Sequence, residues 1–155
     1  MRSRNNVDKR VDQKLDRILD ANFNRTKEGL RVCEDVCRFF LNERRLTQRF
    51  KAVRHELTRL IGPPYLQRFL QGRAIAQDVG RRTSAPELKR QNLTDVFYAN
   101  CQRVKESIRV LEEFLKLRDR RAAMGVKKLR YSVYDLEKQA ALQLPALPHS
   151  RHSRP

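Results

Sequence analysis

One polar pattern occurs twice in this chain and carries the side chains best suited to chemistry. The segments ANFNRTKEGLRVCE (residues 21–34) and ANCQRVKESIRVLE (residues 99–112) share eight of fourteen residues and lie 78 residues apart. Each contains an asparagine, an arginine three residues later and a glutamate three residues after that. A planar guanidinium suits a phosphate or carboxylate, and an amide suits a hydroxyl, another amide or a metal. The repeat therefore indicates two matched sets of groups able to hold an anion.

Helical periodicity places these groups within an apolar arc of each copy. At about 100° per residue, with Asn22 as the reference, Arg25 lies about 60° to one side and Gly29 about 20° away. The apolar residues on this arc are Leu15, Ile18, Val32, Cys33, Val36 and Phe40. The equivalent residues of the second copy are Asn100, Arg103 and Ser107. The pattern predicts that these side chains face inward.

An inward-facing guanidinium is costly unless it is paired or faces a polar cavity, so Arg25 and Arg103 need partners. Glu28 and Glu106 flank the arc at about 120° from the asparagine. The residues that lie further round, and that we expect to be exposed, are Arg31, Arg109, Glu34 and Glu112. Two hypotheses follow with equal support. Either the arginines pair with carboxylates across the fold and fix its register, or they line a pocket for a phosphorylated ligand.

The elements that must position these groups are helical. Trp is absent, and only 5 Gly and 6 Pro interrupt a chain of 155 residues, which favours helix. The periodicity predicts helices over 11–41, 46–61, 86–117 and 121–142, and Gly62-Pro63-Pro64 is expected to stop the second of them. We expect one helical domain over 10–143. Its expected parts are a first repeat over about 12–61, a loop over 62–85, a second repeat over about 86–143, and disordered ends over 1–9 and 144–155.

The second helix of each half is also repeated. The segment FKAVRHEL (residues 50–57) resembles VKKLRYSV (residues 126–133) at an offset of 76, and the match aligns Arg54 with Arg130. The duplicated unit is therefore a helical hairpin. Two such hairpins predict an all-α antiparallel bundle of four main helices with a pseudo-two-fold axis.

The charge of the chain indicates an anionic partner. Thirty-five Lys and Arg face 18 Asp and Glu, giving a formal net charge of +17. This favours a polyanion or a small anionic ligand, and a solvated basic surface without a specific partner is the alternative. Nucleic acid is not expected, because basic residues are not interleaved with aromatic ones and no known binding motif is present. A basic helical nucleic-acid-binding module nevertheless stays an alternative function.

Other classes of site lack their sequence signals. There is no GxxxxGK[ST] or GxGxxG motif and no Cys/His spacing that suits zinc. The cysteines Cys33, Cys37 and Cys101 are odd in number and lie in apolar helical patterns, which predicts reduced core thiols in a cytosolic protein. No apolar run is long enough for a membrane span, and the N-terminus lacks the pattern of a signal peptide. We therefore expect a cytoplasmic protein; the residues do not indicate an oligomeric state.

Four segments resemble a small all-helical family of thiamine biosynthesis. They are Arg17–Asn42, Gln77–Gly80, Glu87–Leu117 and Leu129–Lys138. The resemblance covers about residues 12–140 and includes both repeats. The family occurs alone or fused to the N-terminal side of thiamine-phosphate synthase, and its described activity is ATP-dependent phosphorylation of hydroxymethylpyrimidine phosphate to the diphosphate. Standalone members are often labelled thiamine-phosphate pyrophosphorylase, but the (β/α)₈ barrel of that enzyme needs about 200 residues or more.

The resemblance implies a kinase site that works by positioning and charge neutralisation. ATP and the acceptor monophosphate bring about five to six negative charges into one cavity, so we expect Arg25 and Arg103 to clamp phosphates during transfer. The acceptor is already an oxyanion, and no strong general base is needed. The other expected substrate- or nucleotide-binding residues are Asn22, Asn100, Arg31, Arg109, Arg54, Arg130 and Arg73.

The same resemblance implies magnesium bound together with ATP. The expected catalytic carboxylates and Mg²⁺ ligands are Glu28, Glu106 and Asp78. Gly29 and Ser107 are expected to allow close helix approach beside the ligand. The sequence departs from the family pattern at Ala74, where an acidic residue follows the arginine. A non-catalytic role, binding thiamine precursors or docking on thiamine-phosphate synthase, is the second hypothesis.

Overall fold

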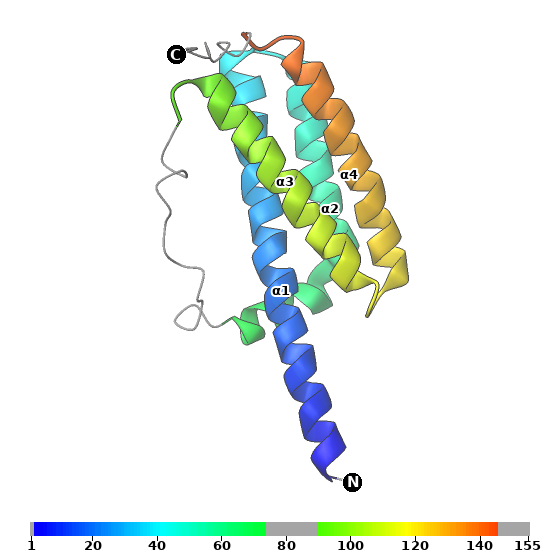
Figure 1. Ribbon diagram of the computed structural model, residues 1–155. Coiled ribbons are helices and arrows are strands. Elements are labelled where there is room, and N and C mark those ends of the chain that lie inside the picture. The colour runs from blue at the N-terminus through cyan, green and yellow to red at the C-terminus, as the bar shows by residue number, and fades with distance from the viewer. Residues whose placement is uncertain (1, 74–89, 146–155) are drawn as a thin grey trace, which may run out of the picture.

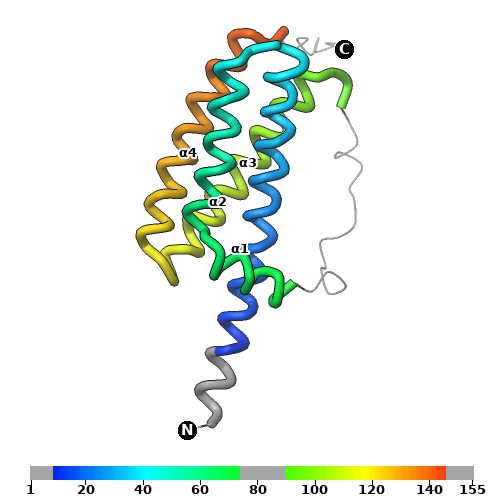
Figure 2. Tube along the Cα trace, turned by 180° about the vertical axis from the view of Figure 1, so that it is seen from behind, coloured from blue at the N-terminus to red at the C-terminus, as the bar shows by residue number. Residues whose placement is uncertain are grey.

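Four helices form an antiparallel bundle in the computed structural model, which describes residues 2–73 and 90–145 and the side chains among them from Lys9 onward. The helices are α1 (Arg2–Asp35), α2 (Arg44–Gly72), α3 (Leu93–Leu115) and α4 (Arg120–Ala141), and a π-helical turn, η1 (Val36–Phe40), follows α1. Each helix runs opposite to its two neighbours (Figures 1 and 2). The pairs in contact are α1 with α2, α1 with α3, α3 with α4, and α2 with α4. The predicted all-α bundle of two hairpins is confirmed.

The core of the bundle is formed by apolar side chains from all four helices. Phe50 of α2 and Phe97 of α3 meet edge to face at 6.1 Å between ring centroids, which joins the two hairpins. Leu19, Ile108 and Val133 are fully buried in the same core. Each such side chain contributes about 1.5–3 kcal/mol by leaving water. None of the described helices is long and apolar enough to cross a membrane.

The crossing of α1 and α3 is unusually close. A Cβ added to Gly29 would lie 2.6 Å from Val104 Cγ2 and 3.1 Å from the carbonyl oxygen of Asn100. Beside it, the hydroxyls of Thr26 and Ser107 are 2.7 Å apart. The small residues expected to allow close helix approach therefore lie where the two repeats pack against each other.

The first hairpin departs from its predicted boundaries at both ends of α1. The helix begins at Arg2 rather than near residue 11, so residues 2–9, expected to be irregular, are helical; no proline or glycine occurs before Gly29 to interrupt them. At the other end η1 adds one residue to the turn, with the Leu41 N–H bonded to the Val36 carbonyl at 3.1 Å. The wider turn rotates Phe40 off the inward arc, and its side chain is exposed.

The second helix continues past the proline pair that was expected to end it. Gly62 has φ 73° and ψ 164°, which breaks the helical backbone, and Pro63 and Pro64 then lie in the first turn of a further helical stretch that ends at Gly72. A proline at the start of a helix loses no hydrogen bond, because the first N–H groups of a helix have no partner there. At the N-terminus of α2, Glu43 caps the N–H groups of Arg45 and Leu46.

The second hairpin begins at a cap that the sequence analysis missed. Asn92 accepts a hydrogen bond from the Asp95 N–H at 2.8 Å, and Asp95 accepts one from the Gln91 N–H at 3.0 Å, so α3 starts at Leu93. The predicted start of this helix at residue 86 lies outside the described residues. The expected disordered tail also lies mostly outside them, although Leu144 is buried.

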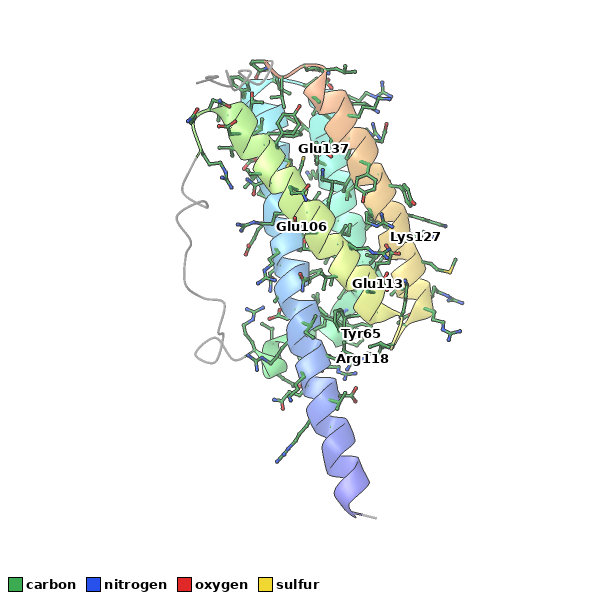
Figure 3. All side chains as sticks on the ribbon, viewed as in Figure 1. Tyr65, Glu106, Glu113, Arg118, Lys127 and Glu137 are labelled. Carbon is green, nitrogen blue, oxygen red and sulfur yellow. The ribbon has the colours of Figure 1, made fainter. Side chains whose placement is uncertain are left out.

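The connection between α3 and α4 is tied back to α1. Arg118 bonds the carboxylates of Asp12, at 2.9 Å, and Asp16. Arg68 of α2 reaches Asp16 as well, at 3.3 Å. Figure 3 shows Arg118 in this position, at the end of the bundle beyond which α1 extends. Buried and half-buried charges thus close that end of the bundle.

Candidate functional site

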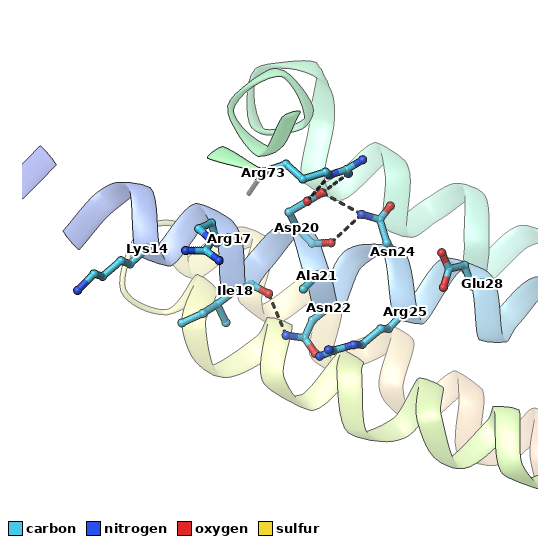
Figure 4. Close-up of a pocket in the computed structure, with 10 residues that line it drawn as sticks. All are labelled: Lys14, Arg17, Ile18, Asp20, Ala21, Asn22, Asn24, Arg25, Glu28 and Arg73. Carbon is cyan, nitrogen blue, oxygen red and sulfur yellow. Dashed lines mark hydrogen bonds and ion pairs between the residues drawn. The ribbon is translucent and has the colours of Figure 1, made fainter. Parts of the chain in front are cut away.

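A cavity with polar walls opens along α1. Its volume is about 770 Å³. Nine residues of α1 line it together with Arg73, which follows the last residue of α2 (Figure 4). The lining residues are Lys14, Arg17, Ile18, Asp20, Ala21, Asn22, Asn24, Arg25, Glu28 and Arg73. We call this cavity the Arg25 pocket.

One wall of the Arg25 pocket is a network centred on Asp20. The Arg73 guanidinium donates to both carboxylate oxygens of Asp20, at 2.7 and 2.6 Å. The Asn24 amide donates to Asp20 Oδ1 at 2.9 Å. Because the Asp20 carboxylate is buried, these donors offset its desolvation. The hydrogen bond to Asp20 also raises the pKa of Arg73, so this guanidinium stays charged.

Asn22 and Arg25 form the side of the pocket that faces α3. The Asn22 amide is buried and donates to the Ile18 carbonyl at 2.8 Å, which fixes its orientation. Arg25 is exposed, and its side chain lies on the same side of α1 as Asn22 (Figure 4). An oriented amide beside an accessible guanidinium is suited to a phosphate that carries a polar organic group.

The net charge of the lining residues is positive. Lys14, Arg17, Arg25 and Arg73 are basic, whereas only Asp20 and Glu28 are acidic. Basic groups outnumber acidic groups in the lining by two. The pocket therefore favours an anion.

The predicted burial of Arg25 and Arg103 is wrong. Both side chains are exposed, one on α1 and one on α3. The apolar arc was centred too close to Asn22, because it left out Leu19, Phe23 and Leu30, which are buried on the other flank of α1. Including them moves the inward direction by about 60°, and the arginine then lies about 110–120° from it.

The two Asn/Arg sets also do not meet in one cavity of the described structure. Asn100 copies Asn22 by donating to the Val96 carbonyl at 2.8 Å, but neither it nor Arg103 lines the Arg25 pocket. Glu106 lies on the surface of α3 (Figure 3) and accepts from the Gln102 amide at 2.8 Å. Because α1 and α3 run antiparallel, equivalent residues of the two repeats lie on opposite sides of the point where the helices cross. The predicted shared cavity is therefore replaced by one pocket on the first repeat.

The repeat instead builds two matching buried ion pairs. Arg54 Nε donates to Glu34 at 3.1 Å, and Arg130 Nε donates to Glu112 at 2.9 Å. Both carboxylates are buried, although both were expected to be exposed. The same shift of the inward direction explains this, since it brings Glu34 within about 60° of the centre. Hydrogen bonds to Tyr134 and Glu112 raise the pKa of Arg130.

Arg31 and Arg109 belong to these pairs rather than to the Arg25 pocket. Arg31 lies 3.4 Å from Glu34, and Arg109 lies 3.0 Å from Glu112. Both arginines are half exposed and sit one helical turn before the glutamate that they contact. Pairing with carboxylates thus describes Arg31, Arg54, Arg109 and Arg130. Arg73 is paired with Asp20 and also lines the Arg25 pocket, as Arg25 does.

A comparison with known protein families identifies the family to which this helical bundle belongs. The model of the ThiD2 family matches residues 17–139, which include both hairpins and both buried pairs. The chain belongs to the ThiD2 family. No solved structure matches the chain.

The relatives of this ThiD2-family chain are larger proteins. It is 45% identical over 123 residues to a thiamine-phosphate synthase of Synechocystis sp. (strain PCC 6803), covering 78% of this chain and 34% of that protein. It is 40% identical over 128 residues to one of Synechococcus sp. (strain CC9605), covering 82% and 35%. A third, of Nostoc punctiforme, is 38% identical over 143 residues, covering 92% and 38%. The chain spans about a third of the length of these curated relatives.

The carboxylates expected to hold magnesium in this ThiD2-family chain do not form a cluster in the described structure. Glu28 and Glu106 are exposed on different helices. Within residues 9–73 and 90–145, no group of three or more His, Cys, Asp or Glu side chains is placed to hold a metal ion. Asp78 lies outside the described residues, so magnesium stays a prediction and no chemical step is derived through it.

Sequence reasoning missed six of the ten residues that line the Arg25 pocket, and two of these, Asp20 and Asn24, build its carboxylate network. Both are polar and lie two residues from Asn22 on either side, which places them about 160° round the helix from it and outside the arc centred on Asn22. An indirect signal was Arg73, an expected binding residue, because a guanidinium commonly pairs with a carboxylate. Asp20 is the buried carboxylate that it reaches.

Proposed function

We propose that this chain serves thiamine-phosphate formation as a helical module that binds a phosphorylated precursor and works beside thiamine-phosphate synthase. The observation that carries the proposal is the match of most of this chain to about a third of each of several proteins named thiamine-phosphate synthase. A helical bundle of this size has no room for the barrel expected for the synthase reaction. The module would therefore contribute binding to that pathway, and the larger relatives would join it to the synthase in one chain.

The Arg25 pocket supports binding of a phosphorylated precursor. Arg25 is accessible at its rim, Asn22 is oriented by its bond to Ile18, and Arg73 is held in place by Asp20. A phosphate would pair with Arg25, while a pyrimidine amine or ring nitrogen would meet the amide groups of Asn22 and Asn24. The ligand inferred from the family resemblance, hydroxymethylpyrimidine phosphate, has both kinds of group.

Kinase activity is the second candidate, favoured by the positive charge and the neighbouring carboxylate of the same pocket. An oxygen of the acceptor phosphate would attack the γ-phosphorus of ATP, and the bond from that phosphorus to the leaving oxygen of ADP would break. Lys14, Arg25 and Arg73 would offset the charge that gathers as the two substrates approach. No side chain needs to remove a proton, because the attacking oxygen is already ionised.

A ligand-binding measurement run beside an ADP-release assay tests both candidates. Purified protein is titrated with hydroxymethylpyrimidine phosphate by calorimetry, with and without ATP and Mg²⁺, and ADP is measured in parallel. Saturable binding without ADP release supports the binding module, and ADP release that depends on the precursor supports the kinase. If the precursor neither binds nor reacts with well-folded protein, both candidates are wrong.

Matched arginine variants locate the effect. Arg25→Gln should weaken binding roughly tenfold, since it removes a charge-assisted hydrogen bond to phosphate. Arg103→Gln is the control, because Arg103 is the equivalent residue of the second repeat and lies outside the pocket. Equal losses in the two variants would show a diffuse effect of surface charge. A steep loss of affinity for any polyanion with rising salt would instead support nucleic-acid binding.

A further inference from the structure

A second cavity lies between α1 and α2 and shares no residue with the Arg25 pocket. Its volume is about 550 Å³. Lys27 of α1 faces Arg54, His55, Thr58 and Arg59 of α2 across it, and the kink at Gly62 forms one end. Every charged side chain that lines it in the described structure is basic. We call this cavity the Lys27 pocket.

Lys27 is the basic group of this pocket that lacks a carboxylate partner. Arg54 is paired with Glu34 and Arg59 with Glu56. Within residues 9–73 and 90–145, Lys27 forms no ion pair, and its Nζ lies 5.3 Å from the ring centroid of Phe23. Burial, and then the nearby charge of Arg54, lowers the pKa of Lys27. Both effects disfavour the charged form of Lys27, and an anion placed here would offset them.

In the second repeat, the lysine equivalent to Lys27 has a carboxylate partner. Lys105 is the counterpart of Lys27, and its Nζ is 2.8 Å from the carboxylate of Glu137. The position equivalent to Glu137 in the first repeat is Ile61, which cannot neutralise a lysine. The second repeat therefore supplies its own negative charge at the place where the first has none.

The second repeat also fills the corresponding space. Tyr134 is the counterpart of Thr58, and its hydroxyl accepts a hydrogen bond from Arg130 at 3.1 Å. Arg130 lies 5.6 Å from the ring centroid of the same tyrosine. Thr58 is much smaller and bonds only toward its own helix, to the Arg54 carbonyl at 3.2 Å. In the first repeat, the space beside Thr58 and the positive charge of Lys27 thus occur in the same pocket.

We propose that the Lys27 pocket is a second anion-binding site, which takes a phosphate or diphosphate group between α1 and α2. The anion would hold the position relative to Lys27 that the Glu137 carboxylate holds relative to Lys105. A lysine ammonium binds phosphate as a point charge, and Arg54, which also lines the pocket, adds a second cationic group. The site does not depend on what binds in the Arg25 pocket.

Nuclear magnetic resonance titration with inorganic pyrophosphate and with inorganic phosphate tests the site. Sodium chloride is adjusted to keep ionic strength constant. The Gly62 amide and the His55 imidazole should shift together and saturate, because both lie on the pocket wall. Comparing the two anions distinguishes a diphosphate site from a monophosphate site. Shifts spread evenly over the basic surface, or none at these two residues, would overturn the proposal.

Two variants and two controls make the test specific. Lys27→Gln should weaken binding roughly tenfold, whereas Lys105→Gln should leave it unchanged, because the charge of Lys105 is already balanced by Glu137. Thr58→Tyr copies the second repeat and should close the pocket even if Lys27→Gln folds poorly. Arg25→Gln should not affect these shifts, so failure of this site and failure of the proposed function are separable. Equal losses in Lys27→Gln and Lys105→Gln would contradict the proposal.

Discussion

The Thr26 hydroxyl lies 2.7 Å from the Ser107 hydroxyl where α1 crosses α3. The repeat aligns Thr26 with Val104 and Gly29 with Ser107. The contact between Thr26 and Ser107 is therefore matched by the contact between Val104 and the position of Gly29, with the partners exchanged between helices. A pseudo-two-fold axis passes between these pairs, and the shape of the whole bundle depends on how closely α1 and α3 approach there.

Gly29→Ala should destabilise the protein. The added methyl group would lie 2.6 Å from Val104 Cγ2 and 3.1 Å from a backbone oxygen of α3, and neither group moves easily because valine is stiff in a helix. We expect a loss of about 1–3 kcal/mol in the free energy of unfolding, measured by urea denaturation. Combining it with Val104→Ala should recover part of the loss.

Gly125→Ala is the matched control for that change. The three atoms nearest to its added methyl group would all belong to the Leu60 side chain, with Cδ2 at 2.6 Å. Leu60 is only partly buried and has a flexible side chain, while alanine favours helix over glycine by about 1 kcal/mol. We expect little change or a small gain in stability. A loss equal to that of Gly29→Ala would show that the helix crossing is not special.

Glu112→Ala should be among the most damaging single changes. It would leave the Arg130 guanidinium, whose side chain is 10% exposed, without its carboxylate. Breaking one partner of a buried pair costs about 3–5 kcal/mol. Glu34→Ala should cost somewhat less, since Arg54 is slightly more exposed and borders the open Lys27 pocket. Guanidinium denaturation of the two variants measures the difference.

An exposed pair provides the comparison for the buried ones. Arg59 and Glu56 form an ion pair on the surface of α2, with 73% and 37% of their side chains exposed. Water and salt screen such a pair, so Glu56→Ala should change stability far less than Glu112→Ala. Similar losses in both would mean that burial of the repeated pairs is not what makes them matter.

The three cysteines should be unreactive in the folded protein. Cys33 and Cys101 are buried with their sulfur atoms 3.5 Å apart, and burial raises the pKa of Cys37 to about 12. Only the thiolate reacts, so raising the pH from 7 to 9 should hardly speed labelling by a disulfide reagent. Labelling should instead follow unfolding, becoming fast in denaturant. Fast reaction of a thiol under native conditions would contradict the described packing.

The positions of the helices could be predicted from the sequence. The side that each helix turns toward the core was predicted less accurately. Two hairpins could be predicted because both helices of the first half are repeated. Residues 21–34 match 99–112 at eight of fourteen positions, and residues 50–57 resemble 126–133. The inward direction of α1 was misjudged because a few apolar residues on one flank were weighted above Leu19 and Phe23. An error of about 60° is enough to exchange a buried arginine for a buried glutamate.

The buried pairs carried a signal that was present in the sequence. Arg54 and Arg130 match between the second helices just as Glu34 and Glu112 match between the first. Opposite charges repeated on both helices of a hairpin predict a contact between them. The Lys27 pocket was harder to find, because its signal is a difference between the copies, Ile61 against Glu137, rather than an identity. The π-helical turn has no simple sequence signal and depends on packing.

The duplication that relates Lys27 to Lys105 has one more consequence. In a homodimer of identical hairpins, any substitution appears twice. A change that opens a cavity for a ligand in one hairpin therefore also reduces the packing of its symmetry-related copy. Tethering both hairpins in one polypeptide removes that constraint. One hairpin keeps Tyr134 and Glu137 and stabilises the bundle. The other has Thr58 and Ile61 at these positions, which leaves space and positive charge for a ligand.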